Sequence, residues 1–397
     1  MPDPLSSFGF ELHGFASEHL MKAIGLMSGT SMDGVDIALL ETDGERIIAF
    51  GPSGGRDYTG EERAFLREAV EAATQLSDRT DRTGILARAE QLITQIHADT
   101  VEEFLIQHGL PRDEVRVVGF HGQTVLHRPE AGLTVQLGDG QLLADLTGID
   151  VVYDFRADDI AQGGEGAPLV PVYHAALATF SGLPRPAVIV NIGGVANVTF
   201  IGEAGELIAF DTGPGNALLD DWMMQQLGEA RDENGQLAAR GQTDGRRLEA
   251  MLANPYFLRK PPKSLDRNAF ALSIMEGLSP EDGAATLTAF TAASLICGAA
   301  HFPATPKIFV LSGGGTRNAT LVGTLRKLLP GRIELADELG WDAGAVEAQA
   351  FAFMAVRSLR GLPISYPGTT GAPQPMTGGI LVQPSESNSM EFENSFA

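Results

Sequence analysis

The fold of this chain is organised around the stretch Ala23-Ile-Gly-Leu-Met-Ser-Gly-Thr-Ser-Met-Asp-Gly-Val-Asp-Ile-Ala-Leu-Leu40. Its apolar ends and polar middle predict a strand over 24–27, a tight turn over 28–34 and a returning strand over 35–41. Glycines in the turn allow close approach to the backbone, and successive amide groups can surround an anion. An ordinary hairpin explains the turn equally well, so the turn alone leaves both interpretations open.

The same plan returns in the middle of the chain. The stretch Pro186-Ala-Val-Ile-Val-Asn-Ile-Gly-Gly-Val-Ala-Asn-Val-Thr-Phe-Ile201 predicts a strand, a glycine-rich turn and a strand, and 207–210 adds a third strand. Residues 46–50 supply the matching third strand after the first hairpin. This self-similarity indicates two domains of like topology. Two tips that face each other across a cleft could hold the phosphates of one nucleotide, and we expect that cleft to close on its ligands.

Apolar spacing elsewhere predicts helices and short strands. The predicted helices cover 61–74, 82–108, 140–147, 319–328 and segments that begin near 217 and 344; the predicted strands cover 115–119, 133–137, 149–153 and 307–312. Four strands should end at polar or glycine-rich stretches, at 121–124, 154–168, 211–216 and 313–318. Open α/β sheets bind ligands beyond the carboxyl ends of their strands, so these stretches are candidates for a functional site.

The composition is that of a globular, enzyme-sized protein. At 397 residues the chain is longer than one ordinary core, so we expect two domains. A net charge of −23 argues against a broad contact with the phosphate backbone of nucleic acid. The one cysteine, Cys297, excludes an internal disulfide framework and suits a reducing compartment, so we expect a cytoplasmic protein. No apolar run reaches membrane-spanning length.

The two ends of the chain differ in character from the middle. Residues 1–20 lack the basic start and the apolar core of a signal peptide, and the first predicted strand follows soon after Met21. We therefore expect 1–21 to be an appended segment with little order and 381–397 to be a polar tail.

The glycine-rich stretches match neither the dinucleotide-binding nor the Walker pattern, and the eight histidines lack the spacing of a zinc site. Over about residues 22–380, the chain instead resembles the anhydro-N-acetylmuramic acid kinase family, part of the superfamily of actin, sugar kinases and heat-shock-chaperone ATPases. The resemblance rests on six segments: Gly25-Leu-Met-Ser-Gly-Thr-Ser-Met-Asp-Gly-Val-Asp36, Gly119-Phe-His-Gly-Gln-Thr124, the run from Asp154 to Pro171, Asn191-Ile-Gly-Gly-Val-Ala-Asn-Val198, Phe210-Asp-Thr-Gly-Pro-Gly-Asn216 and Leu311-Ser-Gly-Gly-Gly-Thr-Arg-Asn318.

The resemblance implies an α/β fold of two domains with similar topology, each a mixed sheet flanked by helices as in ribonuclease-H-like and actin-like ATPases, with a central cleft. The first domain would cover 22–165 and carry the phosphate hairpin at 24–41. The second would cover 166–380 and carry the second phosphate hairpin, the catalytic aspartate and the adenosine loop. Its C-terminal helix could pack back on the first domain.

The resemblance also implies sites for ATP and Mg²⁺. ATP would contact both hairpins and the loop after the strand at 307–312, through Gly29, Thr30, Ser31, Met32, Asp33, Gly34, Val35, Asp36, Gly193, Gly194, Gly313, Gly314, Gly315 and Asn318. Asp33 or Asp36 would hold the magnesium ion through water molecules, because Mg²⁺ keeps several waters in protein sites.

By the same resemblance, Asp211 matches the catalytic base of the family. Kinases of this family open the 1,6-anhydro bridge of the sugar with water while they phosphorylate the freed 6-oxygen. A general base must activate that water on the face opposite the breaking bond. A loop aspartate close to glycines is commonly a turn or helix N-cap residue, and that interpretation stays beside the catalytic one.

Five residues are candidates for contact with the sugar: His121, Gln123, Arg156, Asp159 and Glu347. Arg156 could pair with the lactyl carboxylate that distinguishes muramic acid from glucosamine, or it could form an ion pair that bridges loops. His121 could face the substrate or be structural. Glu347 lies in an otherwise apolar helix, where a carboxylate should face a cleft or a partner because unpaired burial is costly.

The expected function is that of an ATP-dependent sugar kinase of peptidoglycan recycling. It would convert anhydro-N-acetylmuramic acid to N-acetylmuramic acid 6-phosphate and release ADP. We expect the protein to bind the anhydro-amino-sugar as its small-molecule substrate, and to bind neither nucleic acid nor a membrane. Two alternatives remain: a kinase of another small sugar on the same fold, and a nucleotide-binding regulator without sugar chemistry. The oligomeric state is open, a homodimer included.

Overall fold

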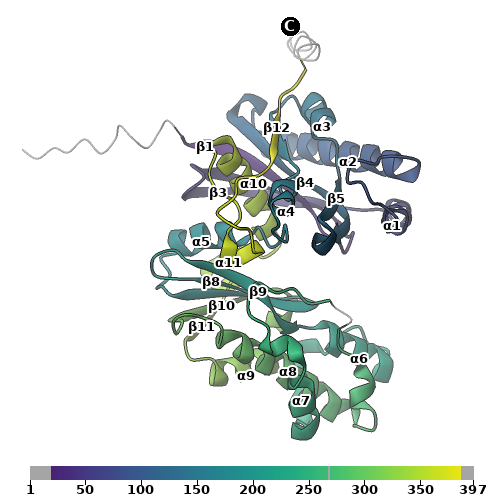
Figure 1. Ribbon diagram of the computed structural model, residues 1–397, viewed down its shortest axis with the longest axis vertical. Helices are drawn as coiled ribbons and strands as arrows, with labels where there is room; N and C mark the ends of the chain where they lie inside the picture. Colours follow the sequence, from purple (N-terminus) through teal and green to yellow (C-terminus); the bar gives the residue numbers. More distant parts are fainter. Residues whose placement is uncertain (1–18, 267–268, 386–397) are drawn as a thin grey trace, which may run out of the picture.

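The computed structural model of the protein describes residues 19–266 and 269–385. The chain forms two β-sheets with helices packed on them, and the two sheets occupy the upper and lower halves of Figure 1. The expectations for the N-terminal segment and the polar tail fall mostly outside the described residues, but their boundaries were wrong, because Met21 and residues 381–382 belong to strands of the first sheet. No helix in the described part is long and apolar enough to cross a membrane.

The first sheet has seven strands and contains the opening hairpin. Its strands are β1 (Met21–Ser28), β2 (Gly34–Thr42), β3 (Ile47–Asp57), β4 (Val115–Arg128), β5 (Leu133–Leu137), β6 (Val151–Tyr153) and β12 (Ile380–Val382). They follow the order β12-β6-β4-β1-β2-β3, with β5 paired to β4. As predicted, β1 and β2 form an antiparallel hairpin, and β1 also pairs in parallel with β4.

The second sheet repeats this core arrangement. Its strands are β7 (Ala187–Ile192), β8 (Val195–Ile201), β9 (Leu207–Pro214), β10 (Ile308–Ser312) and β11 (Arg332–Leu335), in the order β11-β10-β7-β8-β9. Like β1, β7 pairs antiparallel with the next strand and parallel with a later one, β10. Two mixed sheets with the same hairpin-and-third-strand plan, flanked by helices, confirm the predicted fold class.

Helices cover both faces of the two sheets. They are α1 (Gly60–Ala73), α2 (Ile85–His108), α3 (Gly140–Thr147), α4 (Ala157–Ala161), α5 (Pro171–Phe180), α6 (Ala217–Leu227), α7 (Gly245–Leu252), α8 (Pro280–Ala299), α9 (Ala319–Leu328), α10 (Val346–Leu359) and α11 (Pro367–Thr370). Helices α1 to α3 pack on the first sheet, and α8 and α11 both contact β9 of the second. Figure 1 shows α5 and α11 between the two sheets, and α5 contacts β3, β9 and α10.

Helix α10 returns the chain to the first sheet, where it lies across β1, β2 and β4. Two glycines allow this close approach. A Cβ atom on Gly25 would lie 1.8 Å from the carbonyl oxygen of Ala348, and one on Gly119 would lie 2.1 Å from that of Phe351. After α10, β12 adds to the edge of the same sheet by pairing with β6. The N-terminal end of α10 thereby sits at the cleft between the sheets.

Three strands extend further than the sequence predicts. β4 continues through the stretch 121–124, which we expected to be a loop, because Gln123 pairs with both β1 and β5. β9 continues to Pro214, so Asp211 lies within a strand opposite Asn197 instead of in the loop that we expected. β3 runs on to Asp57. In each case a neighbouring strand supplies hydrogen bonds that local sequence does not reveal.

Candidate active site

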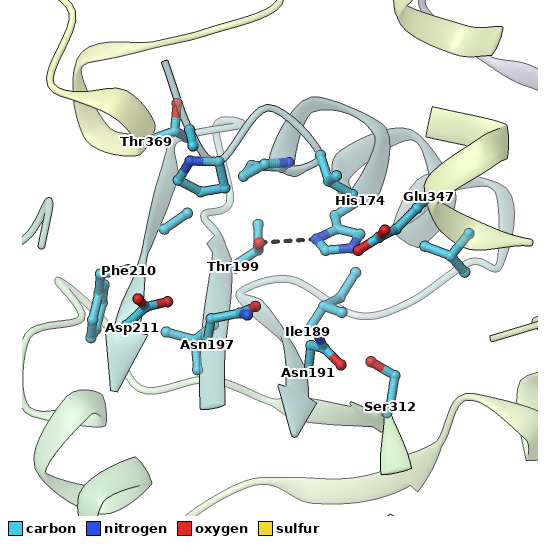
Figure 2. Close-up of a pocket in the computed structure, with 18 of the residues that line it drawn as sticks. His174, Ile189, Asn191, Asn197, Thr199, Phe210, Asp211, Ser312, Glu347 and Thr369 are labelled. Atoms are coloured by element: carbon cyan, nitrogen blue, oxygen red, sulfur yellow. Dashed lines mark hydrogen bonds between the residues drawn. The ribbon is translucent and has the colours of Figure 1, made fainter. Parts of the chain in front are cut away.

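A cavity of about 300 Å³ lies between the second sheet and the helices α5 and α10. Its polar lining comes from several elements: Glu165 before α5, His174 in α5, Asn191, Asn197, Thr199 and Asp211 in the second sheet, Lys263 and Ser264 in the segment after α7, Ser312 at the end of β10, and Glu347 in α10. Figure 2 shows the side chains of His174, Asn197 and Asp211 around one space. This concave, partly polar volume between the second sheet and a helix of the first is typical of a ligand site.

Three hydrogen bonds join Asp211 to the segment 256–265. Its backbone N–H donates to the carbonyl oxygen of Lys263 at 3.0 Å, and the N–H of Leu265 donates to its Oδ2 at 2.8 Å. The hydroxyl of Tyr256 donates to its carbonyl oxygen. Burial raises the pKa of Asp211 to about 6; the Leu265 N–H opposes this rise, and the nearby Glu165 adds to it. A carboxyl group with such a pKa suits a general base near neutral pH.

Opposite Asp211, His174 presents a neutral ring to the cavity. Its Nδ1 lies 2.9 Å from the hydroxyl of Thr199, and burial lowers its pKa to about 4. Sequence reasoning missed His174, Thr199, Asn191 and Asn197. The sequence does contain a signal for the two asparagines, because each one is a polar residue that interrupts an apolar strand. In the structure they pair with each other across the second hairpin.

Glu347 lines the same cavity from the first turn of α10, as expected for a carboxylate in an apolar helix. Figure 2 places its carboxylate in front of the His174 ring. Burial raises the pKa of Glu347 above its ordinary value; Arg156 opposes the rise and Asp36 adds to it. The influence of Asp36 and Arg156 shows that Glu347 stands near both the first hairpin and the loop after β6.

Arg156 and His121 form a buried pair. The Nη2 group of Arg156 donates to Nε2 of His121 at 3.0 Å, and Nη1 donates to the carbonyl oxygen of Gly166 at 2.8 Å. Burial and the neighbouring guanidinium lower the pKa of His121 to about 3, so its ring is neutral and accepts the bond. In the described part of the chain Arg156 makes no ion pair within 4 Å. His121 lines a separate cavity, also of about 300 Å³, with Arg79 and Asp154.

The side chains of Gln123 and Asp159 form hydrogen bonds with other parts of the chain. Gln123 is fully buried, accepts a hydrogen bond from Ser28 at 2.7 Å and donates to the carbonyl oxygen of Gly29 at 3.1 Å. Asp159 is 2% exposed and accepts from the Gly166 N–H and from the hydroxyls of Ser365 and Thr370. Neither residue lines the cavity beside Asp211, and neither do His121 and Arg156, so of the five sugar candidates only Glu347 belongs to its lining.

The tip of the first hairpin is a supported turn with exposed polar groups. Gln123 holds the carbonyl oxygen of Gly29, and Met32 takes a left-handed conformation with φ of 55°. The side chains of Thr30, Ser31 and Asp33 are exposed, whereas Val35 is buried in β2. Partial burial and the carboxylates of Asp342, Asp57 and Asp33 raise the pKa of Asp36.

The second hairpin tip is made of backbone. The carbonyl oxygen of Gly193 accepts from the N–H of Asn216 at 2.7 Å, and that of Gly194 accepts from Gly215 at 2.9 Å. A Cβ atom on Gly193 or Gly194 would meet nothing closer than 3.6 Å. The same holds for Gly29 in the first tip. The packing of the chain in this structure therefore does not require glycine at these positions.

The loop after β10 adjoins the main cavity. Gly313, with φ of 82°, and Ser312 also line a second hollow of about 290 Å³ that continues along Gly314 and Thr316. Gly315 packs on Ile192, where a Cβ atom would lie only 2.3 Å from a side-chain carbon. The side chain of Asn318 caps α9 by accepting from the Leu321 N–H at 2.9 Å, so its role in the structure is a helix cap.

Comparison with known proteins identifies the family. The family model described as anhydro-N-acetylmuramic acid kinase matches residues 21–384. Relatives of that name from Rhodopseudomonas palustris strain HaA2 and Nitrobacter winogradskyi are 55% and 53% identical over 366 residues, which is 92% of this chain and 100% of each relative. One from Methylorubrum extorquens is 52% identical over 375 residues, with the same coverage. The chain therefore belongs to the anhydro-N-acetylmuramic acid kinase family.

Proposed function

We propose that the protein is an ATP-dependent kinase that hydrolytically opens the 1,6-anhydro ring of anhydro-N-acetylmuramic acid and phosphorylates the 6-oxygen. The products are N-acetylmuramic acid 6-phosphate and ADP, which assigns the protein to cell-wall recycling in the cytoplasm. The observation that carries the proposal is Asp211, a carboxylate with raised pKa that faces a polar cavity between two sheets in a chain of this family.

Asp211 acts as the general base for the water. Its Oδ2 is committed to the Leu265 N–H, which leaves Oδ1 to accept a proton from a water molecule in the cavity. The oxygen of that water bonds to the anomeric carbon, and the bond from this carbon to the 6-oxygen breaks on the opposite face. The freed 6-oxygen takes the terminal phosphoryl group of ATP, and ADP leaves. The proton stays on Asp211 until it is released to solvent.

The sugar is held by the polar lining around the base. His174 is neutral and fixed through Thr199, so its ring binds a hydroxyl or amide group of the sugar without adding charge. Asn197 lies opposite Asp211 on the neighbouring strand and can hold the substrate or the water beside the base. Arg156 does not line this cavity, but it influences Glu347, which does, and its Nε lacks a partner in the described part of the chain, so it remains our candidate for the lactyl carboxylate.

The two hairpin tips and the loop at 313–315 bind the nucleotide. The tips offer backbone without side chains at Gly29, Gly193 and Gly194, and the hollow beside Gly313 accepts the adenosine end. Phosphate binding at the two tips agrees with the general property of turns, whose successive backbone N–H groups bind anions.

Asp33 and Asp36 are the proposed residues for Mg²⁺. Desolvation first, and then the carboxylates of Asp342, Asp57 and Asp33, raise the pKa of Asp36, and this concentration of negative charge favours a cation there. No group of three potential metal ligands exists among the described residues, which suits an ion completed by phosphate oxygens and water. When bound, Mg²⁺ neutralises charge on the phosphates.

A coupled assay of ADP release tests the function against its alternatives. We expect release from ATP that depends on 1,6-anhydro-N-acetylmuramic acid, with one sugar phosphate formed for each ADP. Release that requires a different sugar would indicate the second kinase candidate. Nucleotide binding with no sugar-dependent release, over a panel of anhydro and free amino sugars, would indicate a regulator and overturn the proposal.

A further inference from the structure

Lys263 is buried in the wall of the cavity without a counter-ion. It is 3% exposed, and no carboxylate lies within ion-pair distance of it in the described part of the chain. Its ammonium group donates to the carbonyl oxygen of Tyr256 at 3.2 Å and lies 4.6 Å from the centre of that ring and 5.6 Å from the ring of Phe210. Burial of an unpaired charge is costly, so a protein that retains one usually uses it.

The bond between Lys263 and Tyr256 closes a loop around the base. Tyr256 at one end donates its hydroxyl to the carbonyl oxygen of Asp211, and the carbonyl oxygen of Lys263 at the other end accepts the Asp211 N–H. Two residues further on, Leu265 donates to Oδ2 of Asp211. The ammonium group of Lys263 therefore links the two residues, Tyr256 and Lys263, whose hydrogen bonds attach the segment 256–265 to Asp211 in β9.

We propose that Lys263 is a positioning residue for the sugar reaction: its buried ammonium locks the segment 256–265 so that the Leu265 N–H occupies Oδ2 of Asp211 and Oδ1 faces the water. The inference rests on the proposed function of Asp211. Lys263 itself touches neither the water nor the phosphates in this assignment, and it acts only through the hydrogen bonds of the loop.

The consequence is a change in the proton affinity of the base. If the loop relaxes, Asp211 loses the N–H that stabilises its ionised form but remains buried, so its pKa rises further above 6. The other groups that face Asp211 or line its cavity are Tyr256, Glu165, His174 and Glu347. Around the Lys263 ammonium the charged or titratable neighbours are Arg259, Cys297 and His301. None of these is altered by the variants below except Tyr256.

The test is the pH profile of kcat for Lys263→Met, which keeps the length of the side chain and removes the charge. We expect the acidic limb to move up by about one pH unit, which corresponds to the loss of one hydrogen bond to a carboxylate. This shift alone lowers kcat at pH 7 about twofold, and misplacement of the base should bring the total loss to about tenfold. KM for ATP should stay within about twofold, because the hairpin tips are untouched. The matched control is Lys260→Met, an exposed lysine on the same segment, whose profile should coincide with wild type.

A second variant keeps the test decisive. Tyr256→Phe retains both rings and the carbonyl bond to Lys263 but removes the hydroxyl that holds Asp211, so its acidic limb should also move up. If Lys263→Met folds and its profile coincides with wild type, the proposal is overturned. If it does not fold, Tyr256→Phe tests the step on which the proposal depends: a profile that coincides with wild type would show that loosening the segment 256–265 does not reach the base, and would overturn the proposal as well. Carboxyl ¹³C shifts of labelled aspartate, with Asp211→Asn to identify the signal, give the pKa of Asp211 even if the wild-type enzyme does not act on the anhydro-sugar.

Discussion

The two hairpin units of this protein share a topology and differ in chemistry. In β1–β2–β3 the tip carries hydroxyls and carboxylates and is held from below by the buried side chain of Gln123. In β7–β8–β9 the tip is bare glycine held by backbone N–H groups from residues 215 and 216. Only the second unit places a partly buried carboxylate with a raised pKa, Asp211, in its third strand. Under the proposed function, both tips contact the phosphates, but the candidate cation ligands lie only in the first unit and the candidate base only in the second.

The largest effect should come from removing the base of the second unit. We expect Asp211→Asn to lower kcat at least a thousandfold, about 4 kcal/mol of barrier, because the amide cannot take the proton of the water. The affinity for ATP and the circular dichroism spectrum should remain those of wild type. Single-turnover kinetics with equilibrium nucleotide binding measure both. Retention of more than about a tenth of kcat would assign the base to another residue.

Two glycines of the first unit allow a sharper test of the phosphate site. Gly25 is required for packing against α10, whereas Gly29 lies in the tip that we assign to the phosphates. Gly25→Ala should destabilise the protein by about 3 kcal/mol, since its Cβ would lie 1.8 Å from the Ala348 carbonyl oxygen under α10. Gly29→Ala meets nothing closer than 3.6 Å and should change stability by less than about 0.5 kcal/mol.

Nucleotide binding should distinguish the same two variants in the opposite way, with ATP affinity lowered in Gly29→Ala and unchanged in Gly25→Ala. A methyl group at Gly29 obstructs the approach of phosphate to the tip, so we expect several-fold weaker ATP binding for Gly29→Ala. Gly25 lies beneath the helix and away from the tip, so the folded fraction of Gly25→Ala should bind ATP normally. Urea unfolding and calorimetric titration give the two quantities, and unchanged ATP affinity in Gly29→Ala would remove the first tip from the phosphate site.

Local sequence was sufficient for most of the fold. Both hairpins and the helix α9 lie where apolar periodicity and turn residues predict them, because these elements are determined by near neighbours. The extension of β4 and β9 was not predictable in this way, since pairing with distant strands creates it. The position of Asp211 beside a cavity followed from its motif, but its three hydrogen bonds with the segment 256–265 did not.

The roles of buried polar residues depended most on distant contacts. Asp159 bonds to Ser365 and Thr370, which are 206 and 211 positions away in the chain. A motif that contains Asp159 therefore cannot tell whether its carboxylate faces a ligand or another loop. Asn318 illustrates the same limit at short range, because an asparagine after a glycine loop serves equally as a ligand or as the N-cap that it forms here.

A smaller effect follows from the raised pKa of Asp211. Its pKa is about 6 in the folded protein against an ordinary 3.8, so the folded state binds the proton more tightly. This preference is present below pH 4 and is lost as the pH rises towards 6 and above, at a cost on the order of 3 kcal/mol. Asp211→Asn has no such charge, so its stability relative to wild type should increase between pH 4 and 7. Urea unfolding across that range would refute this if the two stability curves ran parallel.

The smallest expected effect concerns what supports the first tip. Gln123→Leu removes the group that accepts from Ser28 and donates to Gly29, but Ser28 keeps the hydroxyl of Tyr58 at 2.8 Å. The carbonyl oxygen of Gly29 keeps the Met32 N–H at 3.1 Å, so only the two hydrogen bonds of the Gln123 side chain are lost and we expect a loss of about 1 kcal/mol in stability.

The same change should loosen only the first of the two tips. The Gly193–Gly194 tip is held by backbone groups, and among residues 19–266 and 269–385 no side chain bonds to these two carbonyl oxygens as Gln123 bonds to that of Gly29. We therefore expect KM for ATP to rise about threefold in Gln123→Leu while the acidic limb of kcat, which reports Asp211 in the second unit, stays in place. Gln95→Leu, at an exposed position of α2, is the matched control and should change neither. A shift of the acidic limb in Gln123→Leu would show that the two units are coupled and that the division of work between them is incomplete.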